Sequence, residues 1–186
     1  MSINYSLIST FKFLKVLRFL IIIVVISCED PDYNLNNPFD PNNMDLDPPA
    51  LFFHPFILDA SFGETIEVEL YGYQLDSSAA AHFDIRYDWG SLEYVSVIPG
   101  PFFEGINSPI EITVHEQGVL NLFMYYLPDI NSNQSIDGTW SIATIYFSTI
   151  SRGESELLYG PNTTIRDASN NILPINDYGK GYINVE

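Results

Sequence analysis

Polar and apolar residues alternate with a period of two through most of the chain after Leu51. In the segment that begins this pattern, Ile66, Val68 and Leu70 lie on one side of an extended backbone, and Thr65, Glu67 and Glu69 lie on the other. The segment 81–88 repeats the alternation. Successive side chains of a β-strand point to opposite faces, so this period predicts strands with one buried face.

Shorter alternating or apolar runs predict further strands at 91–98, 110–115, 119–126, 139–149, 156–159, 163–166, 172–175 and 182–185. Turn-forming residues separate them at 88–90, 137–138, 169–171 and 179–181. The segment 119–126 is apolar on both faces, so we expect it to lie centrally, with 139–149 as its pairing partner. No stretch after residue 50 has a convincing helical apolar stripe. The pattern therefore predicts an all-β sandwich of about nine antiparallel strands, over residues 51–186.

The first 27 residues have the order of a secretory signal peptide. Lys12, Lys15 and Arg18 precede the eight apolar residues 19–26, and Ser27 precedes Cys28. The apolar run is too short for a membrane-spanning helix, which needs about 20 residues. The segment from Val25 to Cys28 resembles a bacterial lipobox, which implies that Cys28 is lipidated and becomes the first mature residue. The alternative is an ordinary cleaved signal peptide followed by a free thiol.

Residues 28–50 are expected to form a flexible tether. This segment is rich in Pro, Asn and Asp and has few residues that could build a core. A lipid on Cys28 followed by such a tether indicates a protein of the bacterial cell envelope, anchored in a membrane and compatible with display at the cell surface. The sequence does not indicate whether this membrane is the inner or the outer one, or which leaflet holds the lipid.

The charge of the chain after Cys28 restricts its partners. This part has 24 acidic and four basic residues, a net charge of −20. Such a surface repels nucleic acid, so nucleic-acid binding is not expected. Basic proteins, divalent cations and neutral sugars remain compatible. Cys28 is the only cysteine, so the domain cannot contain a disulfide.

Five segments, in order, resemble those of cohesin domains. They are GETIEVEL from Gly63, FDIRYD from Phe83, SLEYVSVIPG from Ser91, DGTWSIATIYF from Asp137, and the closing segments 166–175 and 181–185. The resemblance covers roughly residues 60–186. It implies a nine-stranded jelly-roll sandwich related to carbohydrate-binding modules, and a protein partner of the dockerin type. A single domain without repeats or a surface-layer segment departs from the family's usual setting, which leaves the dockerin partner open.

One loop has the spacing of a calcium site. Oxygen-bearing side chains recur at Asp129, Asn131, Asn133 and Asp137. Oxygen ligands at alternate loop positions suit a hard cation such as calcium. The EF-hand pattern is incomplete, since Gln134 replaces the required Gly and Trp140 the bidentate Glu. The alternative is a turn that such side chains favour by capping their own backbone.

Several aromatic residues are candidates for a surface that binds sugar or a partner. They are Trp89, Phe102, Phe103, Tyr125 and Tyr126. A flat ring can stack on the apolar face of a sugar, but each ring could instead pack in the core. A partner-binding face could also use outward charges on two predicted strands, namely Glu67, Glu69, Asp84 and Arg86. Such charges are more often a solvated surface.

Nothing in the sequence indicates catalysis. The three histidines lack metal-ligand spacing, and there is no nucleophile elbow or phosphate-binding Gly-rich loop. We therefore expect no enzyme and no cofactor other than calcium at the loop described above. The first hypothesis is a non-catalytic module that binds a protein partner. The alternatives are a carbohydrate-binding module and a structural envelope component.

Overall fold

The computed structural model describes residues 45–103, 110–126 and 135–186. Thirteen strands and one 3-10 turn (η2, Pro101–Phe103) are found there, and no α-helix. The strands are β1 Ala50–His54, β2 Ile57–Ala60, β3 Thr65–Ser78, β4 Ala80–Tyr87, β5 Leu92–Pro99, β6 Ile110–Glu116, β7 Val119–Tyr125, β8 Ile136–Thr149, β9 Gly153–Tyr159, β10 Thr164–Arg166, β11 Ile172–Leu173, β12 Asp177–Tyr178 and β13 Gly181–Val185.

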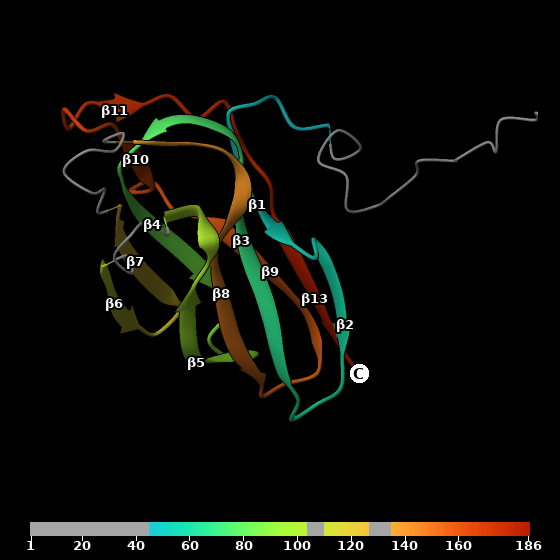
Figure 1. The fold of residues 1–186 in the computed structure, drawn as a ribbon. Helices are drawn as coiled ribbons and strands as arrows, with labels where there is room; N and C mark the ends of the chain where they lie inside the picture. The colour runs from blue at the N-terminus through green and yellow to red at the C-terminus, as the bar shows by residue number, and fades with distance from the viewer. Residues whose placement is uncertain (1–44, 104–109, 127–134) are drawn as a thin grey trace, which may run out of the picture. The chain divides into compact units, whose positions relative to one another are not determined.

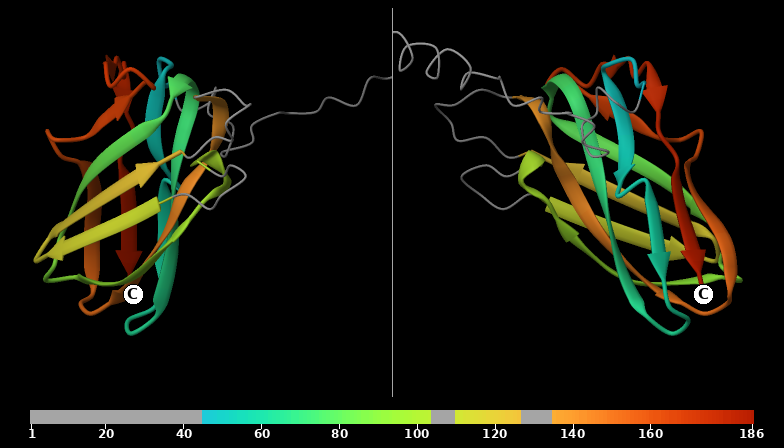
Figure 2. Two further views of the ribbon diagram at one scale, coloured as in Figure 1. Left: turned by 60° about the vertical axis from the view of Figure 1, so that its left-hand side comes forward. Right: turned by 90° about the vertical axis from the view of Figure 1, so that its right-hand side faces the viewer.

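The strands form two sheets that face each other (Figures 1 and 2). The first has the order β12–β1–β3–β8–β5. The second has the order β11–β10–β4–β9–β13–β2, and on the other side of β4 it continues through β7 to β6. The predicted all-β sandwich is confirmed. The strand number is higher than nine because short pieces at the edges pair separately, and two edge pairings, β1–β12 and β2–β13, are parallel.

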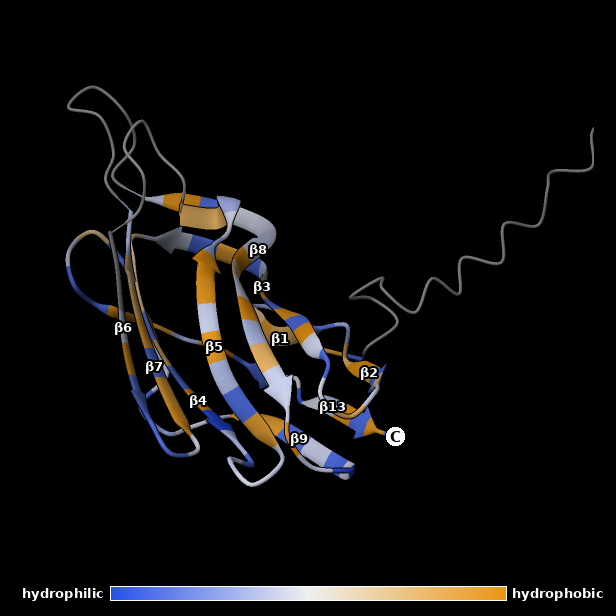
Figure 3. Ribbon diagram, turned by 90° about the horizontal axis from the view of Figure 1, so that it is seen from below, coloured by the Kyte–Doolittle hydropathy of each residue, from blue (hydrophilic) through white to orange (hydrophobic). Residues whose placement is uncertain are grey.

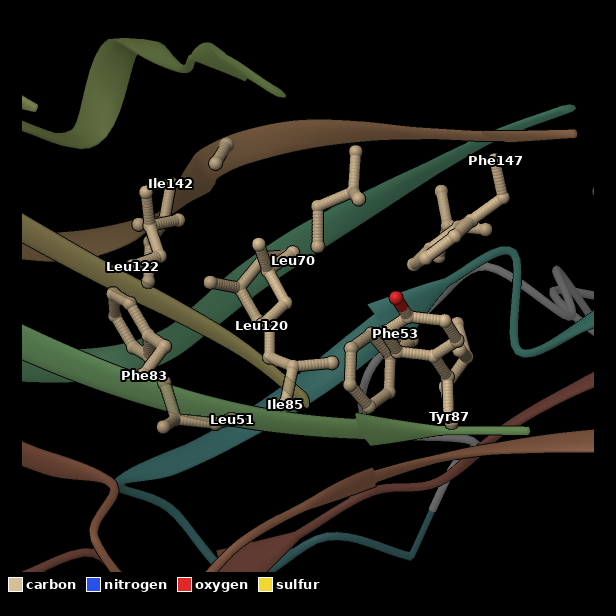
Figure 4. Close-up of a cluster of buried hydrophobic side chains, with 14 of the residues drawn as sticks. Leu51, Phe53, Leu70, Phe83, Ile85, Tyr87, Leu120, Leu122, Ile142 and Phe147 are labelled. Carbon is tan, nitrogen blue, oxygen red and sulfur yellow. The ribbon is translucent and has the colours of Figure 1, made fainter. Parts of the chain in front are cut away.

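The predicted alternation places the core between the sheets. Ile66, Val68 and Leu70 of β3 are buried. Thr65, which precedes them, and Glu67, which lies between the first two, are exposed. Figure 3 shows the same change of hydropathy along the other strands. In Figure 4, side chains of β4 and β7 meet those of β3 and β8 in one shared layer. Burial of this apolar layer, at about 25 cal/mol per Å² removed from water, is the main stabilising contribution.

The predicted pairing of 119–126 with 139–149 is wrong. β7 lies between β4 and β6 in one sheet, and β8 lies between β3 and β5 in the other. Both strands are rich in apolar residues because both line the same core from opposite sides, as Leu122 and Ile142 show in Figure 4. Hydrophobic pattern alone does not distinguish a neighbour within a sheet from a neighbour across the core.

Two other expectations need correction. Asp137 and Gly138 were expected to form a turn between strands, but they lie inside β8, where the register with β3 shifts. Gly138 has φ = 124°, a conformation that glycine adopts readily, so it fits a bulge as well as a turn. The predicted start of the folded domain at residue 51 is also too late, because Ala50 already belongs to β1.

The end of the expected tether packs on the outer side of the first sheet. Leu46 contacts a small buried cluster that includes Phe52 and Tyr73. The Asp47 amide donates to an Asp177 carboxylate oxygen over 2.9 Å, and the Asn176 amide donates to the Pro49 carbonyl over 2.8 Å. Residues 46–50 are therefore part of the sandwich. Leu46 covers the apolar patch that Phe52 and Tyr73 form on this face.

The apolar run 19–26 and Cys28 lie outside the described residues. Within the described part of the chain, no helix is long and apolar enough to cross a membrane. The signal peptide and the lipid anchor therefore stay predictions from the sequence.

Candidate functional site

One outer face of the sandwich combines uncovered apolar side chains with a small polar network. The strand register places the outward side chains of β4, β7 and β6 in rows, with His82 beside Phe123 and Asn121 beside Val114. Tyr125 lies at one end of the same outward row on β7. We call these five residues the β4–β7 face.

The centre of the β4–β7 face is ordered by contacts between two strands. The His82 ring stacks on the Phe123 ring, with centroids 4.2 Å apart and an interplanar angle of 12°. His82 Nε2 lies 2.9 Å from the Asn121 side-chain oxygen, so this nitrogen carries the proton that is donated. Cross-strand pairs of this kind fix side chains that would otherwise lose entropy on binding, so the centre of the face is preorganised.

The flanks of the face are apolar and open to solvent. Tyr125 is 41% exposed, although the inward residues of β7 are fully buried, and Val114 on β6 is 47% exposed. Isolated exposed apolar residues are common on proteins, but a row beside an ordered polar pair is typical of an interaction surface. No other described segment covers these side chains.

Charged side chains belong to both sheets. The outward side of the first sheet carries Glu67, Glu69 and Glu93. The strands of the second sheet carry Arg86 and Arg166, and also carboxylates such as Glu116 on β6 and Glu154 on β9. Charge alone therefore does not distinguish the two faces.

Asp84 and Arg86 are not free to bind a partner, which corrects the expectation that they form an outward charged face. Asp84 is fully buried. Arg86 Nε lies 2.6 Å from one carboxylate oxygen, and Arg86 Nη2 donates to the other over 2.8 Å. Asn162 also donates to this carboxylate, and the Gly160 amide donates to the Asp84 carbonyl. The hydrogen bonds from Asn162 and Gly160 to Asp84 therefore hold the β9–β10 loop against β4.

These contacts change the pKa of Asp84. Burial alone would raise this pKa, but the hydrogen bond and charge of Arg86, together with the hydrogen bonds of Asn162, outweigh burial and lower it. The ionised carboxylate is thus the form that stabilises the fold.

Phe102 and Phe103 are not a binding platform, contrary to the expectation of partial exposure. Both are fully buried in the main core, with ring centroids 4.9 Å apart in an edge-to-face arrangement. The turn η2 places both rings against β8, where they cover apolar surface of the core.

Trp89 and Tyr125 are both exposed, but the structure does not bring them together. Trp89, 56% exposed, lies in the turn after β4 and close to Gly118. Tyr125 pairs with Ala80 at the opposite end of β4. Tyr126 is half-buried and packs against the core. Of the predicted aromatic candidates, only Tyr125 belongs to the β4–β7 face.

Most of the predicted calcium loop lies outside the described residues, namely Asp129, Asn131 and Asn133. Asp137 is described, and its carboxylate accepts a hydrogen bond from the Ser77 amide over 2.6 Å. Among the residues that the structure describes, no group of three or more His, Cys, Asp or Glu side chains could hold a metal ion. Calcium binding stays a prediction.

The comparisons with known proteins agree on one family. A family model for the cohesin domain matches residues 58–177. No curated protein matches the chain.

Solved structures with this fold have similar descriptions. A non-cellulosomal cohesin from the archaeon Archaeoglobus fulgidus has 15% sequence identity and a TM-score of 0.61, over 74% of this chain and 90% of that one. A type II cohesin domain from the cellulosome of Acetivibrio cellulolyticus has 16% identity and a TM-score of 0.63, over 73% and 94%. A chain of a type I cohesin–dockerin complex from Clostridium thermocellum has 15% identity and a TM-score of 0.57, over 74% and 94%. At such identities the likeness shows a shared fold.

Replacement of Asp84 tests its role as the fastening of the β9–β10 loop. Asp84→Asn should lower the free energy of unfolding at pH 7 by about 2–3 kcal/mol, because Arg86 loses its buried counter-charge. The difference from the natural protein should shrink as the pH falls below the ordinary Asp pKa of about 3.9 and through the lowered folded-state pKa, since protonation removes the same charge. Urea unfolding at a series of pH values measures this difference.

Asp59→Asn, on the exposed side of β2, is the matched control and should change stability by no more than about 0.5 kcal/mol. A difference between Asp84→Asn and the natural protein that stays constant with pH would show that the Asp84 charge does not stabilise the fold.

Proposed function

The chain belongs to the cohesin domain family, and from this premise we propose that it is a non-catalytic module that binds a protein partner through the β4–β7 face. The family match covers the sandwich from β2 to the start of β12. The observation that carries the proposal is the ordered pair of His82 and Asn121 between the exposed side chains of Tyr125 and Val114.

The chemistry of this face suits a protein surface. Tyr125 and Val114 offer apolar area that a partner can bury, and the half-buried ring of Phe123 continues it inward. The His82–Asn121 pair offers hydrogen-bonding groups that are already oriented. Exposed apolar side chains next to a few fixed polar groups are a common composition of an interface.

The opposite sheet has a different mixture of side chains. Val95, Ile98 and Trp140 are more than half exposed there, beside outward carboxylates such as Glu67 and Glu69, which are costly to desolvate. Its apolar patch around Phe52 is already covered by Leu46. The ordered pair of His82 and Asn121 favours the β4–β7 face as the surface that a partner covers.

A dockerin-type domain is the partner that the family supports best. One structural relative is a type I cohesin found in complex with a dockerin. We propose a partner of this class, with a surface that is apolar where it meets Tyr125 and that carries hydrogen-bonding side chains opposite His82 and Asn121. The carbohydrate-binding alternative loses two of its five proposed rings, since Phe102 and Phe103 are buried.

The proposal includes an anchor in the cell envelope. Cys28 follows an apolar run and precedes a Pro-rich acidic segment, and this order supports lipidation of a bacterial lipoprotein. An anchor of this kind would hold the module, and with it a partner, close to a membrane.

Truncation of one ring on the β4–β7 face should weaken partner binding. We expect Tyr125→Ala to raise the Kd for the partner about tenfold, because a tyrosine that a partner covers often contributes more than 1 kcal/mol to an interface. The measurement is calorimetric titration with purified dockerin domains, and with any protein captured from a lysate of the source cells.

Tyr178→Ala is the matched control, because Tyr178 is 43% exposed on β12, away from this face, and its loss should leave the Kd unchanged. Equal binding by the natural protein and Tyr125→Ala would contradict the proposed surface.

The anchor has a separate test. Cys28→Ala should move the protein from the membrane fraction to the soluble fraction, because the residue that would carry the lipid is gone. Membrane fractionation of producing cells followed by immunodetection measures the distribution. The far-ultraviolet circular dichroism of the variant should still be that of a β-protein. A variant that stays fully in the membrane fraction would contradict lipidation at Cys28.

A further inference from the structure

The outward surface of the second sheet continues from β4 onto β10 and β11. β10 pairs with β4 so that Arg166 lies beside Ala80, and β11 pairs with β10 so that Ile172 lies beside Arg166. Directly opposite residues of antiparallel strands share a face of the sheet. Since Tyr125 pairs with Ala80 on the other side of β4, the outward row of Tyr125 extends through Arg166 to Ile172. Ile165, next to Arg166, is fully buried in the core, which agrees with this orientation.

This row holds one cation between two exposed apolar side chains. Ile172 is 60% exposed and Tyr125 is 41% exposed, whereas Arg166 is half-buried. Ala80 separates Arg166 from Tyr125 and adds only a methyl group to the surface. Neighbouring strands lie about 4.8 Å apart, so the row from Ile172 to Tyr125 spans about 14 Å. An ionic group that meets Arg166 here is flanked by apolar surface, which excludes water and strengthens the attraction between opposite charges.

The guanidinium of Arg166 is held in place but is not neutralised. Its Nη1 donates to the Asn170 carbonyl over 2.9 Å, which ties the side chain to the β10–β11 turn. Within the described part of the chain, Arg166 forms no ion pair and no other hydrogen bond. The neighbouring Asp167 carboxylate is occupied by the amides of Ser169 and Asn171 and by the Asn171 side chain. A guanidinium has five N–H donors, so most of those of Arg166 are free to bind a partner.

The other basic residues of the sandwich do not offer this arrangement. Arg86 is bound to both carboxylate oxygens of Asp84. Lys180 Nζ lies 3.7 Å from a carboxylate oxygen of β9. Arg152 lies in the turn between β8 and β9, outside the outward rows of the sheet. Of the four basic residues that follow Cys28, Arg166 is therefore the one that an approaching partner can pair with on this surface.

The described carboxylates on the outward side of β4, β6, β7, β10 and β11 are those of Asp84 and Glu116. Asp84 is buried and paired with Arg86. Glu116 is exposed at the far end of β6, about 20 Å from Arg166 along the strand direction. This surface is thus positive at one end and negative at the other, which gives a partner of matching polarity one preferred orientation.

The group that suits Arg166 best is a carboxylate. The planar fork of a guanidinium binds both oxygens of a carboxylate, with a geometry that neutral groups do not match. The net charge of −20 after Cys28 repels a partner that is acidic throughout, so the carboxylate must be an isolated one. We propose that Arg166 binds an Asp or Glu side chain of the protein partner, between apolar side chains that cover Tyr125 and Ile172. This inference rests on the proposed function of the β4–β7 face, and it makes Arg166 the residue that selects and orients the partner.

Calorimetric titration of the full chain with purified dockerin domains tests the role of Arg166. Arg166→Ala should raise the Kd about tenfold, because a charge-assisted pair is lost, and Arg166→Lys, which keeps the charge without the fork, about threefold. The effect of Arg166→Ala should be smaller in about 0.5 M salt than in about 0.05 M salt, since salt screens the pair. Arg152→Ala, which removes the same charge outside this surface, is the matched control and should leave the Kd unchanged.

An exchange of charges identifies the partner's side of the contact. Arg166→Glu should weaken binding more than Arg166→Ala, because two carboxylates then face each other. Each surface Asp and Glu of the dockerin domain is replaced in turn by Arg. One of these replacements should weaken binding to the natural protein and restore binding to Arg166→Glu. The melting temperatures of the Arg166 variants should stay close to that of the natural protein, because the side chain holds only the Asn170 carbonyl.

Two blocked tripeptides test the carboxylate preference without a dockerin domain. The Nε–H signal of Arg166 is followed by nuclear magnetic resonance while acetyl-Leu-Asp-Leu-amide or acetyl-Leu-Asn-Leu-amide is added to about 10 mM. The Asp peptide should move this signal clearly more than the Asn peptide, and neither should move that of Arg152.

The two experiments separate the two proposals. If no dockerin domain binds, the proposed function fails, and the tripeptides still decide whether Arg166 recognises a carboxylate. The inference is overturned if the two tripeptides have the same effect on the Arg166 signal or have none. It is also overturned if dockerin binding is weakened by Tyr125→Ala but not by Arg166→Ala, a result that leaves the proposed function intact.

Discussion

The apolar layer shared by the two sheets is the constraint on which the other features depend. Each strand of this layer buries every second residue, as Leu70 of β3 and Phe83 of β4 show from opposite sides of the core. A shift of one residue in any strand would turn its buried side chains to solvent, so the core fixes the register. The register in turn decides which side chains meet on the outer faces. The pair of His82 and Asn121 is thus a consequence of core packing on the other side of the same strands.

The two sheets share one core, but their outer faces leave different side chains exposed. On the first sheet, Leu46 covers the apolar patch around Phe52, whereas carboxylates and the side chains of Ile98 and Trp140 stay exposed. On the second sheet, Tyr125 and Val114 stay exposed beside an ordered polar pair. Asp84 lies on β4 beside this face. Arg86 neutralises its buried carboxylate, and the hydrogen bonds from Asn162 and Gly160 to Asp84 hold the β9–β10 loop in place. One fold thereby presents two separate surfaces with different chemistry.

The sequence predicted the features that depend on local pattern, which are the sandwich, most of its strands and the inward residues of β3 and β4. Features that depend on contacts between distant segments were missed or misplaced. Phe102 and Phe103 follow a Pro-Gly-Pro break and resemble an exposed loop, but they close one end of the core. Asp84 has the position of an outward charge, but a loop about 78 residues later covers it. The contact between His82 and Asn121 could not be predicted, because it requires the register of β4 with β7.

The central claim is that a protein partner covers the β4–β7 face, and mapping the bound surface in solution tests it most directly. Backbone amide signals of the isotope-labelled protein are followed by nuclear magnetic resonance while the bound dockerin-type partner is titrated in. We expect the largest signal changes within β4, β6 and β7, centred on His82 and Phe123, with little change in β3, β5 and β8. Changes centred on Glu67 and Glu69 of β3, with an unchanged β7, would contradict the account.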